Sequence, residues 1–227
     1  MIGVFDSGVG GLTALYELRR LLPRVNLTYL ADRENAPYGT KSAEEILRFS
    51  KNNISRLRSL GAEKILIACC TAGTLYPYLS PEEQEISVPI IKPASRAALA
   101  ATKNKRVAVI ATRATVRSRA FALALEEHAD CKILQCDAQE LVSLVESGTR
   151  DSRPLTKYEE SILAEATAPV LSFGADTLIL GCTHFPHLMG HIARLLPGVT
   201  LINPSLEGAL EIAKYSFPDE DGRTVYL

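Results

Sequence analysis

Short runs of aliphatic residues recur along the chain, and each has the length of a β-strand. The runs are almost continuously apolar and do not alternate with polar residues, which is typical of strands buried on both faces of a parallel sheet. The runs that we predict to be strands are Ile2–Phe5, Leu27–Leu30, Ile65–Ala68, Val107–Ile110, Ile133–Gln135, Leu178–Gly181 and Val199–Ile202.

Segments with apolar residues at helical spacing separate these runs. The predicted helices are Leu12–Leu22, Ala43–Leu60, Val116–Glu127, Ala138–Glu146 and Tyr158–Phe173. Strands and helices therefore alternate along the chain, and this order predicts the α/β class.

One stretch of sequence occurs twice. Ser59–Cys69 and Ser172–Cys182 align without a gap, and equivalent positions are 113 residues apart (182 minus 69). In each copy a helix ends at a glycine, an acidic residue begins a turn, an aliphatic strand follows, and a cysteine stands at the carboxyl end of that strand. The chain therefore contains two related halves.

A weaker similarity supports this division. Ile2–Phe5 leads into Asp6-Ser7, and Val107–Ile110 leads into Ala111-Thr112, so each half has a strand that ends in a hydroxyl-bearing loop.

The repeat also predicts where a ligand binds. Ligands of open α/β sheets bind beyond the carboxyl ends of the strands, so two facing halves would bring Cys69 and Cys182 to one cleft. We predict two pseudo-symmetric parallel-sheet α/β domains, residues 1–94 plus 204–227 and residues 95–203, with the active site in the cleft between them.

Composition narrows the classes of partner. The 227 residues include 25 Lys and Arg against 26 Asp and Glu, so no excess of basic residues indicates binding to nucleic acid or to a membrane surface. We find neither a secretion signal nor an apolar run of membrane-spanning length, and we expect a cytoplasmic protein with a small-molecule substrate. Five cysteines, an odd number, make a disulfide framework improbable in a reducing compartment.

The repeated cysteines stand apart from the others. A free cysteine is usually inert packing, and Cys131 and Cys136 fit that interpretation. Cys69 and Cys182 occupy equivalent strand ends, where amide N–H groups and a helix dipole favour a thiolate. Inverting a carbon stereocentre requires a base on one face and an acid on the other. One thiolate and one thiol suit that reaction, which needs no cofactor, and we expect none.

A metal site is the alternative for these cysteines. Cys69-Cys70 and Cys182-Thr183-His184 both lack the spacing of zinc ligands, and a set of four ligands would have to be assembled from elsewhere. We therefore predict no metal. The repeat pairs Cys69, and not Cys70, with Cys182.

Three further segments carry polar groups. The loop Asp6–Gly11 is neither a dinucleotide-binding nor a Walker A sequence. Its N–H groups and Ser7 are suited to bind a carboxylate. Asp6 would then be free to contact a substrate ammonium or to hold a nearby thiol. Tyr38 lies in a turn and can close over a ligand, although such turns are more often structural. His184 can tune the nearby thiol or donate to the substrate, although a lone histidine is usually structural.

Together these motifs resemble those of the aspartate/glutamate racemases, and among them the glutamate racemases of peptidoglycan precursor synthesis. The matching segments are Ile2–Gly8, Pro37–Gly39, Ala68–Ala72, Val145-Glu146 and Gly181–His184. The resemblance implies two pseudo-symmetric domains around one active site, interconversion of L- and D-glutamate without a cofactor, and a homodimer.

The resemblance also implies roles for single residues. Cys69 is similar to the thiol that deprotonates the D-enantiomer, and Cys182 to the thiol that deprotonates the L-enantiomer. The supporting acid/base residues it implies are Asp6, Glu146 and His184. The substrate-binding residues it implies are Asp6, Ser7, Tyr38, Gly39, Cys70, Thr71, Thr183 and His184.

Cys70 departs from the family pattern, because glutamate racemases usually have Asn at this position. A thiol bonds more weakly than an amide, and losing a hydrogen bond to a charged group costs about 1.5–3 kcal/mol. Aspartate or hydantoin racemisation therefore stays open, as does a non-catalytic paralogue that binds an amino acid or a protein partner. A thiol hydrolase would leave the second strand-end cysteine unexplained.

Overall fold

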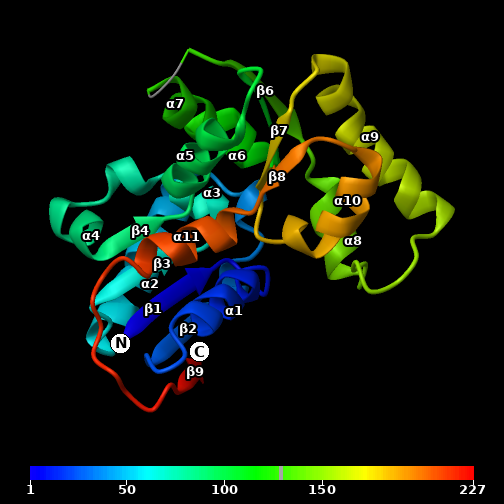
Figure 1. Cartoon of the computed structure of the whole chain (residues 1–227). Coiled ribbons are helices and arrows are strands. Elements are labelled where there is room, and N and C mark those ends of the chain that lie inside the picture. The colour runs from blue at the N-terminus through cyan, green and yellow to red at the C-terminus, as the bar shows by residue number, and fades with distance from the viewer. Residues whose placement is uncertain (128–129) are drawn as a thin grey trace.

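A computed structural model describes residues 1–127 and 130–227, and two parallel sheets organise it (Figure 1). The strands are β1 (Ile2–Asp6), β2 (Leu27–Ala31), β3 (Lys64–Ile67), β4 (Ser87–Pro89), β5 (Arg106–Ala111), β6 (Lys132–Asp137), β7 (Thr177–Gly181), β8 (Thr200–Ile202) and β9 (Thr224–Tyr226). The first sheet has the order β4-β3-β1-β2-β9 and the second the order β6-β5-β7-β8.

Helices fill the segments between the strands. The α-helices are α1 (Leu12–Leu21), α2 (Ala43–Ser59), α3 (Cys70–Gly73), α4 (Pro81–Ile86), α5 (Ile91–Ala101), α6 (Arg113–Ser118), α7 (Ala120–Glu126), α8 (Glu140–Glu146), α9 (Lys157–Phe173), α10 (Met189–Leu195) and α11 (Pro204–Ile212). Short 3-10 helices are η1 (Arg33–Asn35), η2 (Tyr38–Thr40), η3 (Tyr76–Tyr78) and η4 (Phe185–Leu188). The two longest helices, α2 and α9, both begin with a capping box, at Ser42 and at Thr156.

The two sheets repeat one topology, which confirms the predicted halves. Reversing the second order gives β8-β7-β5-β6, which corresponds strand for strand to β4-β3-β1-β2, with β9 as an addition to the first sheet. The aligned stretches contribute β3 and β7, and both are preceded by a left-handed glycine at a helix end, Gly61 with φ 94° and Gly174 with φ 70°.

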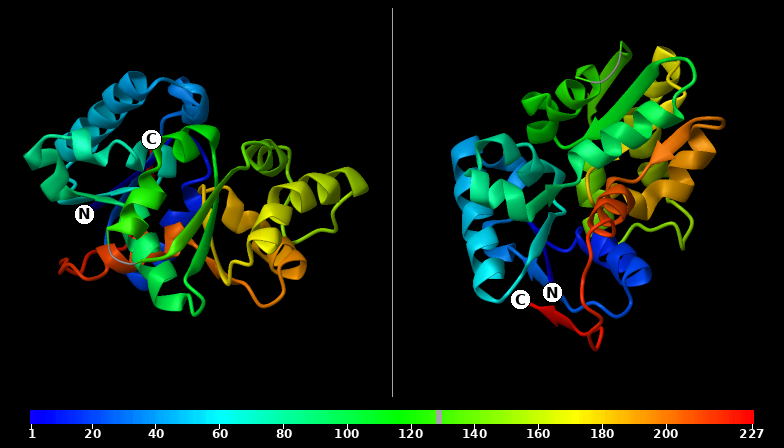
Figure 2. Two further views of the ribbon diagram at one scale, coloured as in Figure 1. Left: turned by 90° about the horizontal axis from the view of Figure 1, so that it is seen from above. Right: turned by 60° about the vertical axis from the view of Figure 1, so that its left-hand side comes forward.

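Two helices connect the lobes built on these sheets. The chain leaves the first lobe through α5 and returns through α11, which packs against α1, α5, β3 and β7 (Figures 1 and 2). Buried residues of both lobes form one continuous apolar cluster, from Val4 and Leu66 to Val109 and Ile179. The predicted domain limit at residues 94 and 95 falls inside α5, and the limits remain a prediction.

The structure corrects two expectations about helices. The segment expected as one helix over Val116–Glu127 is divided into α6 and α7 at Arg119, which adopts a left-handed conformation with φ 56°. Helix α5, like α3, α4, α10 and α11, was not among the expected helices, and it contains Pro93. Proline is tolerated there because it lies in the first turn, where no intrahelical N–H bond is lost.

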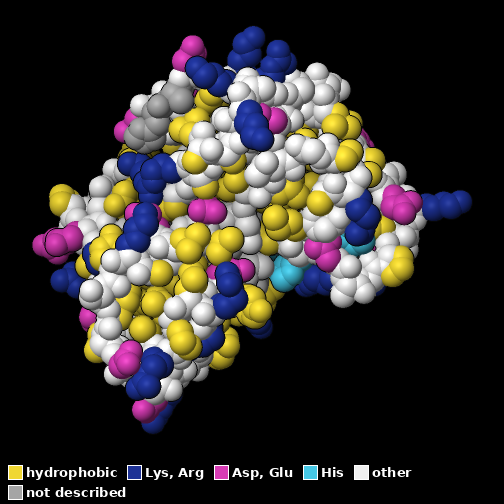
Figure 3. Space-filling model, viewed as in Figure 1, with side chains coloured by type: hydrophobic (Ala, Val, Ile, Leu, Met, Phe, Trp, Pro, Cys, Tyr) yellow, Lys and Arg dark blue, Asp and Glu magenta, His cyan; other side chains and the backbone are white. Residues whose placement is uncertain are grey.

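The surface is mixed in charge. On the face shown in Figure 3, Lys and Arg side chains are interspersed with Asp and Glu side chains and with apolar groups. Across residues 1–127 and 130–227, no helix is both long enough and apolar enough to cross a membrane.

Candidate active site

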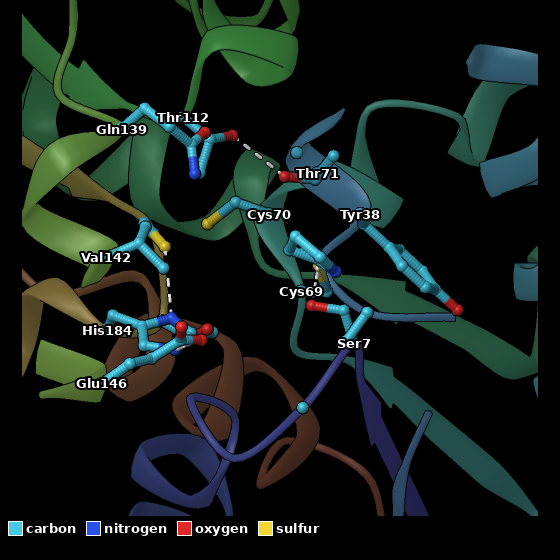
Figure 4. A pocket seen from close by; sticks show the side chains of 16 residues that line it. Ser7, Tyr38, Cys69, Cys70, Thr71, Thr112, Gln139, Val142, Glu146 and His184 are labelled. Carbon is cyan, nitrogen blue, oxygen red and sulfur yellow. Dashed lines mark hydrogen bonds and ion pairs between the residues drawn. The ribbon is translucent and has the colours of Figure 1, made fainter. Parts of the chain in front are cut away.

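A cavity lies between the lobes, where β1 and β3 of one sheet and β7 of the other reach their carboxyl ends. The sequence-predicted residues that line it are Ser7, Tyr38, Gly39, Cys69, Cys70, Thr71, Glu146, Cys182, Thr183 and His184. Asp6 is the one predicted site residue outside this lining, and it is fully buried beside it. The two repeats therefore bring both of their cysteines to a single cavity (Figure 4).

Cys69 lies between β3 and α3, and only 5% of its surface is exposed. Its thiol donates a long hydrogen bond of 3.7 Å to the Ser7 hydroxyl. Burial, and after it the negative charge of Asp6, raise the pKa of the Cys69 thiol to about 12, although the backbone N–H groups of Ala72 and Ser7 oppose the increase. The thiol is therefore protonated at neutral pH in the free protein.

Cys182 follows β7 in the second lobe. Its sulfur is 3.6 Å from Nδ1 of His184. Burial raises the pKa of this thiol well above its usual range, and the nearby Cys69 and Asp6 add to the increase. Backbone amides lower the pKa of both thiols, as expected, but burial outweighs them in the free protein, and α3, whose dipole could assist Cys69, has only four residues.

The raised pKa of Cys69 predicts slow alkylation by iodoacetamide. Only the thiolate reacts, so the rate at Cys69 should be low at pH 7 and should rise with pH toward 12. Asp6→Asn removes a negative charge that raises this pKa, so alkylation of Cys69 should be faster at any fixed pH below it. Tandem mass spectrometry separates Cys69 from Cys70, and Cys131 is the internal control. Equal rates at Cys69 in both proteins would contradict the influence of Asp6.

Asp6 joins the two lobes next to the cavity. Its carboxylate accepts hydrogen bonds from the backbone N–H of Gly8 at 2.9 Å and from the hydroxyl of Thr183 at 3.2 Å. The carbonyl of Thr183 accepts a second bond from Thr13, whose hydroxyl also lies 2.8 Å from that of Ser205. The loop after β1 is thereby fixed to the residue that follows Cys182.

His184 and Glu146 lead from Cys182 toward solvent. His184 is buried, whereas the side chain of Glu146 is 57% exposed, and Nε2 of His184 lies 3.4 Å from Oε1 of Glu146 without forming an aligned hydrogen bond. Figure 4 shows the two side chains next to each other at one end of the cavity. This arrangement can carry charge or a proton between the thiol and solvent.

Tyr38 is anchored away from the cavity. Its hydroxyl donates to the carboxylate of Asp32 and accepts from Asn53 at 3.1 Å, and its ring packs against Phe49. Figure 4 shows the hydroxyl pointing out of the site. In this structure Tyr38 therefore forms part of the wall, and closure of its side chain over a ligand remains a prediction.

Sequence reasoning missed several residues of the lining, above all Thr112. Its hydroxyl lies 3.0 Å from that of Thr71 in the opposite lobe, and both lie within 3.2 Å of the hydroxyl of Thr115. The match between Asp6-Ser7 and Ala111-Thr112 was the signal that could have identified it. Gln139 and Val142 also line the cavity, from the segment after β6, and only their place near a strand end indicated this.

In the described part of the chain, no group of three or more His, Cys, Asp or Glu side chains is arranged to hold a metal ion. The cavity presents three thiols, several hydroxyls and the exposed carboxylate of Glu146, with the buried carboxylate of Asp6 beside it. These are groups that bind a polar substrate and exchange protons with it.

Comparison with known proteins relates this chain to racemases. A family model described as Asp/Glu/Hydantoin racemase matches residues 15–211. The glutamate racemase of Persephonella marina is 38% identical over 214 residues, which cover 94% of this chain and 81% of that protein.

Solved structures agree with the sequence match. A glutamate racemase isoform from Bacillus anthracis has a TM-score of 0.88 at 32% identity, and the match covers 100% of this chain and 86% of that one. The glutamate racemase from Francisella tularensis in complex with D-glutamate has a TM-score of 0.87 at 28% identity, over 99% and 86% of the two chains. The resemblance drawn from the motifs is thereby confirmed.

Proposed function

Because the chain belongs to the Asp/Glu/hydantoin racemase family, we propose that it is a glutamate racemase that interconverts L- and D-glutamate. The observation that carries the proposal is the placement of Cys69 and Cys182, from the two related halves, on one interdomain cavity. The similarity to glutamate racemases over most of both chains favours glutamate over aspartate or a hydantoin.

The reaction consists of two proton transfers. Cys69, as a thiolate, takes the α-proton of D-glutamate, and Cys182, as a thiol, gives its proton to the opposite face of the same carbon. One C–H bond breaks and one forms, and each sulfur exchanges its role with the other. The reverse reaction begins with a thiolate at Cys182, so a single enzyme serves both directions.

Substrate binding provides a positive charge that allows a catalytic thiol to ionise. Asp6 and burial disfavour a thiolate at Cys69 in the free protein. The ammonium group of glutamate, placed near Asp6, compensates the carboxylate and lowers the pKa of the thiols toward neutrality. Asp6 supports the Cys69 side, whereas His184 and Glu146 support the Cys182 side.

Hydroxyl groups of both lobes are suited to the two carboxylates. Ser7 and the backbone N–H groups of its loop provide one set of donors. Thr71 and Thr112 provide a second set, and their hydroxyls lie 3.0 Å apart across the lobe boundary. Glutamate would therefore contact both lobes and hold them together around its α-carbon.

We also assign the protein to the cytoplasm, as a homodimer that supplies D-glutamate for peptidoglycan. Cys69, Cys70, Cys131, Cys136 and Cys182 are all free, which suits a reducing compartment. Size-exclusion chromatography with light scattering would test the dimer.

The decisive experiment is incubation of the purified protein with L-glutamate in D2O without pyridoxal phosphate or added metal. We expect the optical rotation to be lost while deuterium is incorporated at the α-carbon, because each proton transfer passes through a thiol that exchanges its proton with solvent. Polarimetry measures the first change and NMR the second. Binding without α-proton exchange would favour the non-catalytic paralogue. Faster turnover of aspartate than of glutamate would overturn the assigned substrate.

A further inference from the structure

Gln139 separates the catalytic cavity from a second, outer cavity. The outer cavity is open to solvent, and the basic residues Lys41, Arg113 and Arg117 are among those that line it. Of the residues that line either cavity, Gly39 and Gln139 are the two that they share. Gly39 on one lobe and Gln139 on the other therefore lie at the place where the two cavities adjoin.

The contact between these two residues is close. A Cβ atom at Gly39 would stand 2.8 Å from Oε1 of Gln139 and 3.5 Å from its Nε2, so the carboxamide occupies space that only glycine leaves free. Oε1 of Gln139 is buried and makes no hydrogen bond to another described residue. Buried polar atoms are rarely unpaired, so this carboxamide has hydrogen-bonding capacity available for a ligand.

The carboxamide also lies near the position where the family pattern is broken. Cys70 replaces the asparagine that glutamate racemases usually carry, and its sulfur lies inside the cavity. Figure 4 shows the amide nitrogen of Gln139 directed into the cavity toward Cys70, beside Thr112. An amide from the opposite lobe therefore lines the same cavity as Cys70, whose own side chain has no amide.

We propose that Gln139 is a specificity-determining residue that closes the catalytic cavity and binds the substrate. Its carboxamide moves off Gly39 to admit glutamate from the outer cavity, and Nε2 then donates a hydrogen bond to the substrate carboxylate beside Thr112. The proposal rests on the proposed racemase function. The basic outer cavity suits an anionic substrate, although Arg113 is already paired with Asp137 at 2.7 Å.

Two substitutions test this role. Gln139→Met keeps the length of the side chain and removes its hydrogen bonds, and Gln139→Glu keeps the shape but places a negative charge against a carboxylate. We expect Kd and KM for glutamate to rise about tenfold or more in the first variant and further in the second, with kcat changed much less. Gln135→Met, on β6 of the same lobe and outside the cavity, is the matched control.

The readouts separate the two proposals. Calorimetric Kd values report on Gln139 even without turnover, and circular dichroism verifies that each variant is folded. Kd and KM within about twofold of the wild-type values in both variants would overturn the role of Gln139 while wild-type exchange in D2O remained intact. Wild-type protein that binds glutamate but exchanges no α-proton would overturn the racemase proposal alone. No glutamate binding by the wild type would overturn both.

Discussion

Replacement of either Cys69 or Cys182 by Ser is expected to lower racemisation of glutamate by roughly 10²–10⁴-fold, because a positioned acid or base contributes about that much. A serine hydroxyl fits the space of the thiol but ionises far less readily, so it is a poor base and a poor acid. Optical rotation measures inversion, and NMR measures exchange of the α-proton for each enantiomer separately. The remaining thiol should still exchange the α-proton of the enantiomer that it faces.

The pattern across the two variants is more informative than either loss alone. Cys182→Ser should retain more exchange on D-glutamate, and Cys69→Ser should retain more on L-glutamate. Cys131→Ser, outside the cavity, should racemise glutamate at the wild-type rate in both directions and serves as the control. Full inversion by either catalytic-site variant would refute a mechanism in which each thiol serves one face.

The two thiols are related by the repeat but do not have equivalent surroundings. Cys69 has Ser7 and the buried Asp6 nearby, whereas Cys182 has His184 and, beyond it, the exposed Glu146. The backbone therefore preserves the symmetry of the two halves, while the side chains give each thiol its own partners.

The parts of this structure that the sequence predicted are those encoded locally. The repeated glycine, strand and cysteine identify β3 and β7, because a buried parallel strand needs a continuous apolar run and a helix often ends at a left-handed glycine. The general rule for parallel sheets then places Cys69 and Cys182 at one cleft. The strands expected at Ile133–Gln135 and Val199–Ile202 are also present, as β6 and β8 with slightly different ends.

The features that sequence reasoning missed depend on how the lobes meet. Thr112 reaches Thr71, and Gln139 reaches Gly39, only because segments far apart in the chain pack across the cavity. The raised pKa of Cys69 likewise depends on burial, which no local pattern reports. Glu146 was identified only through the family resemblance, because on its own helix it is an exposed charge.

The close packing of Gly10 against the other lobe predicts a second large effect, a loss of activity in Gly10→Ala. A Cβ atom at this position would stand 2.5 Å from the hydroxyl oxygen of Thr183 and 2.7 Å from Nδ1 of His184. The first of these atoms binds Asp6 and the second contacts Cys182. The added methyl must displace both, and we expect kcat/KM to fall by about 10–100-fold, since a small misplacement of catalytic groups is costly.

Stability should fall together with activity in Gly10→Ala. Overpacking of a close contact costs about 1–3 kcal/mol, which corresponds to a decrease in Tm of about 3–10 °C for a chain of this size. Gly73→Ala is the matched control, because its Cβ would meet the side chain of Ile91 at 3.4 Å, an ordinary contact, and it should lower neither Tm nor activity. Calorimetric melting and steady-state kinetics measure both effects. Wild-type kinetics in Gly10→Ala would mean that the lobes work further apart than in this structure, so that Thr183 and His184 have room to yield without disturbing Asp6 or Cys182.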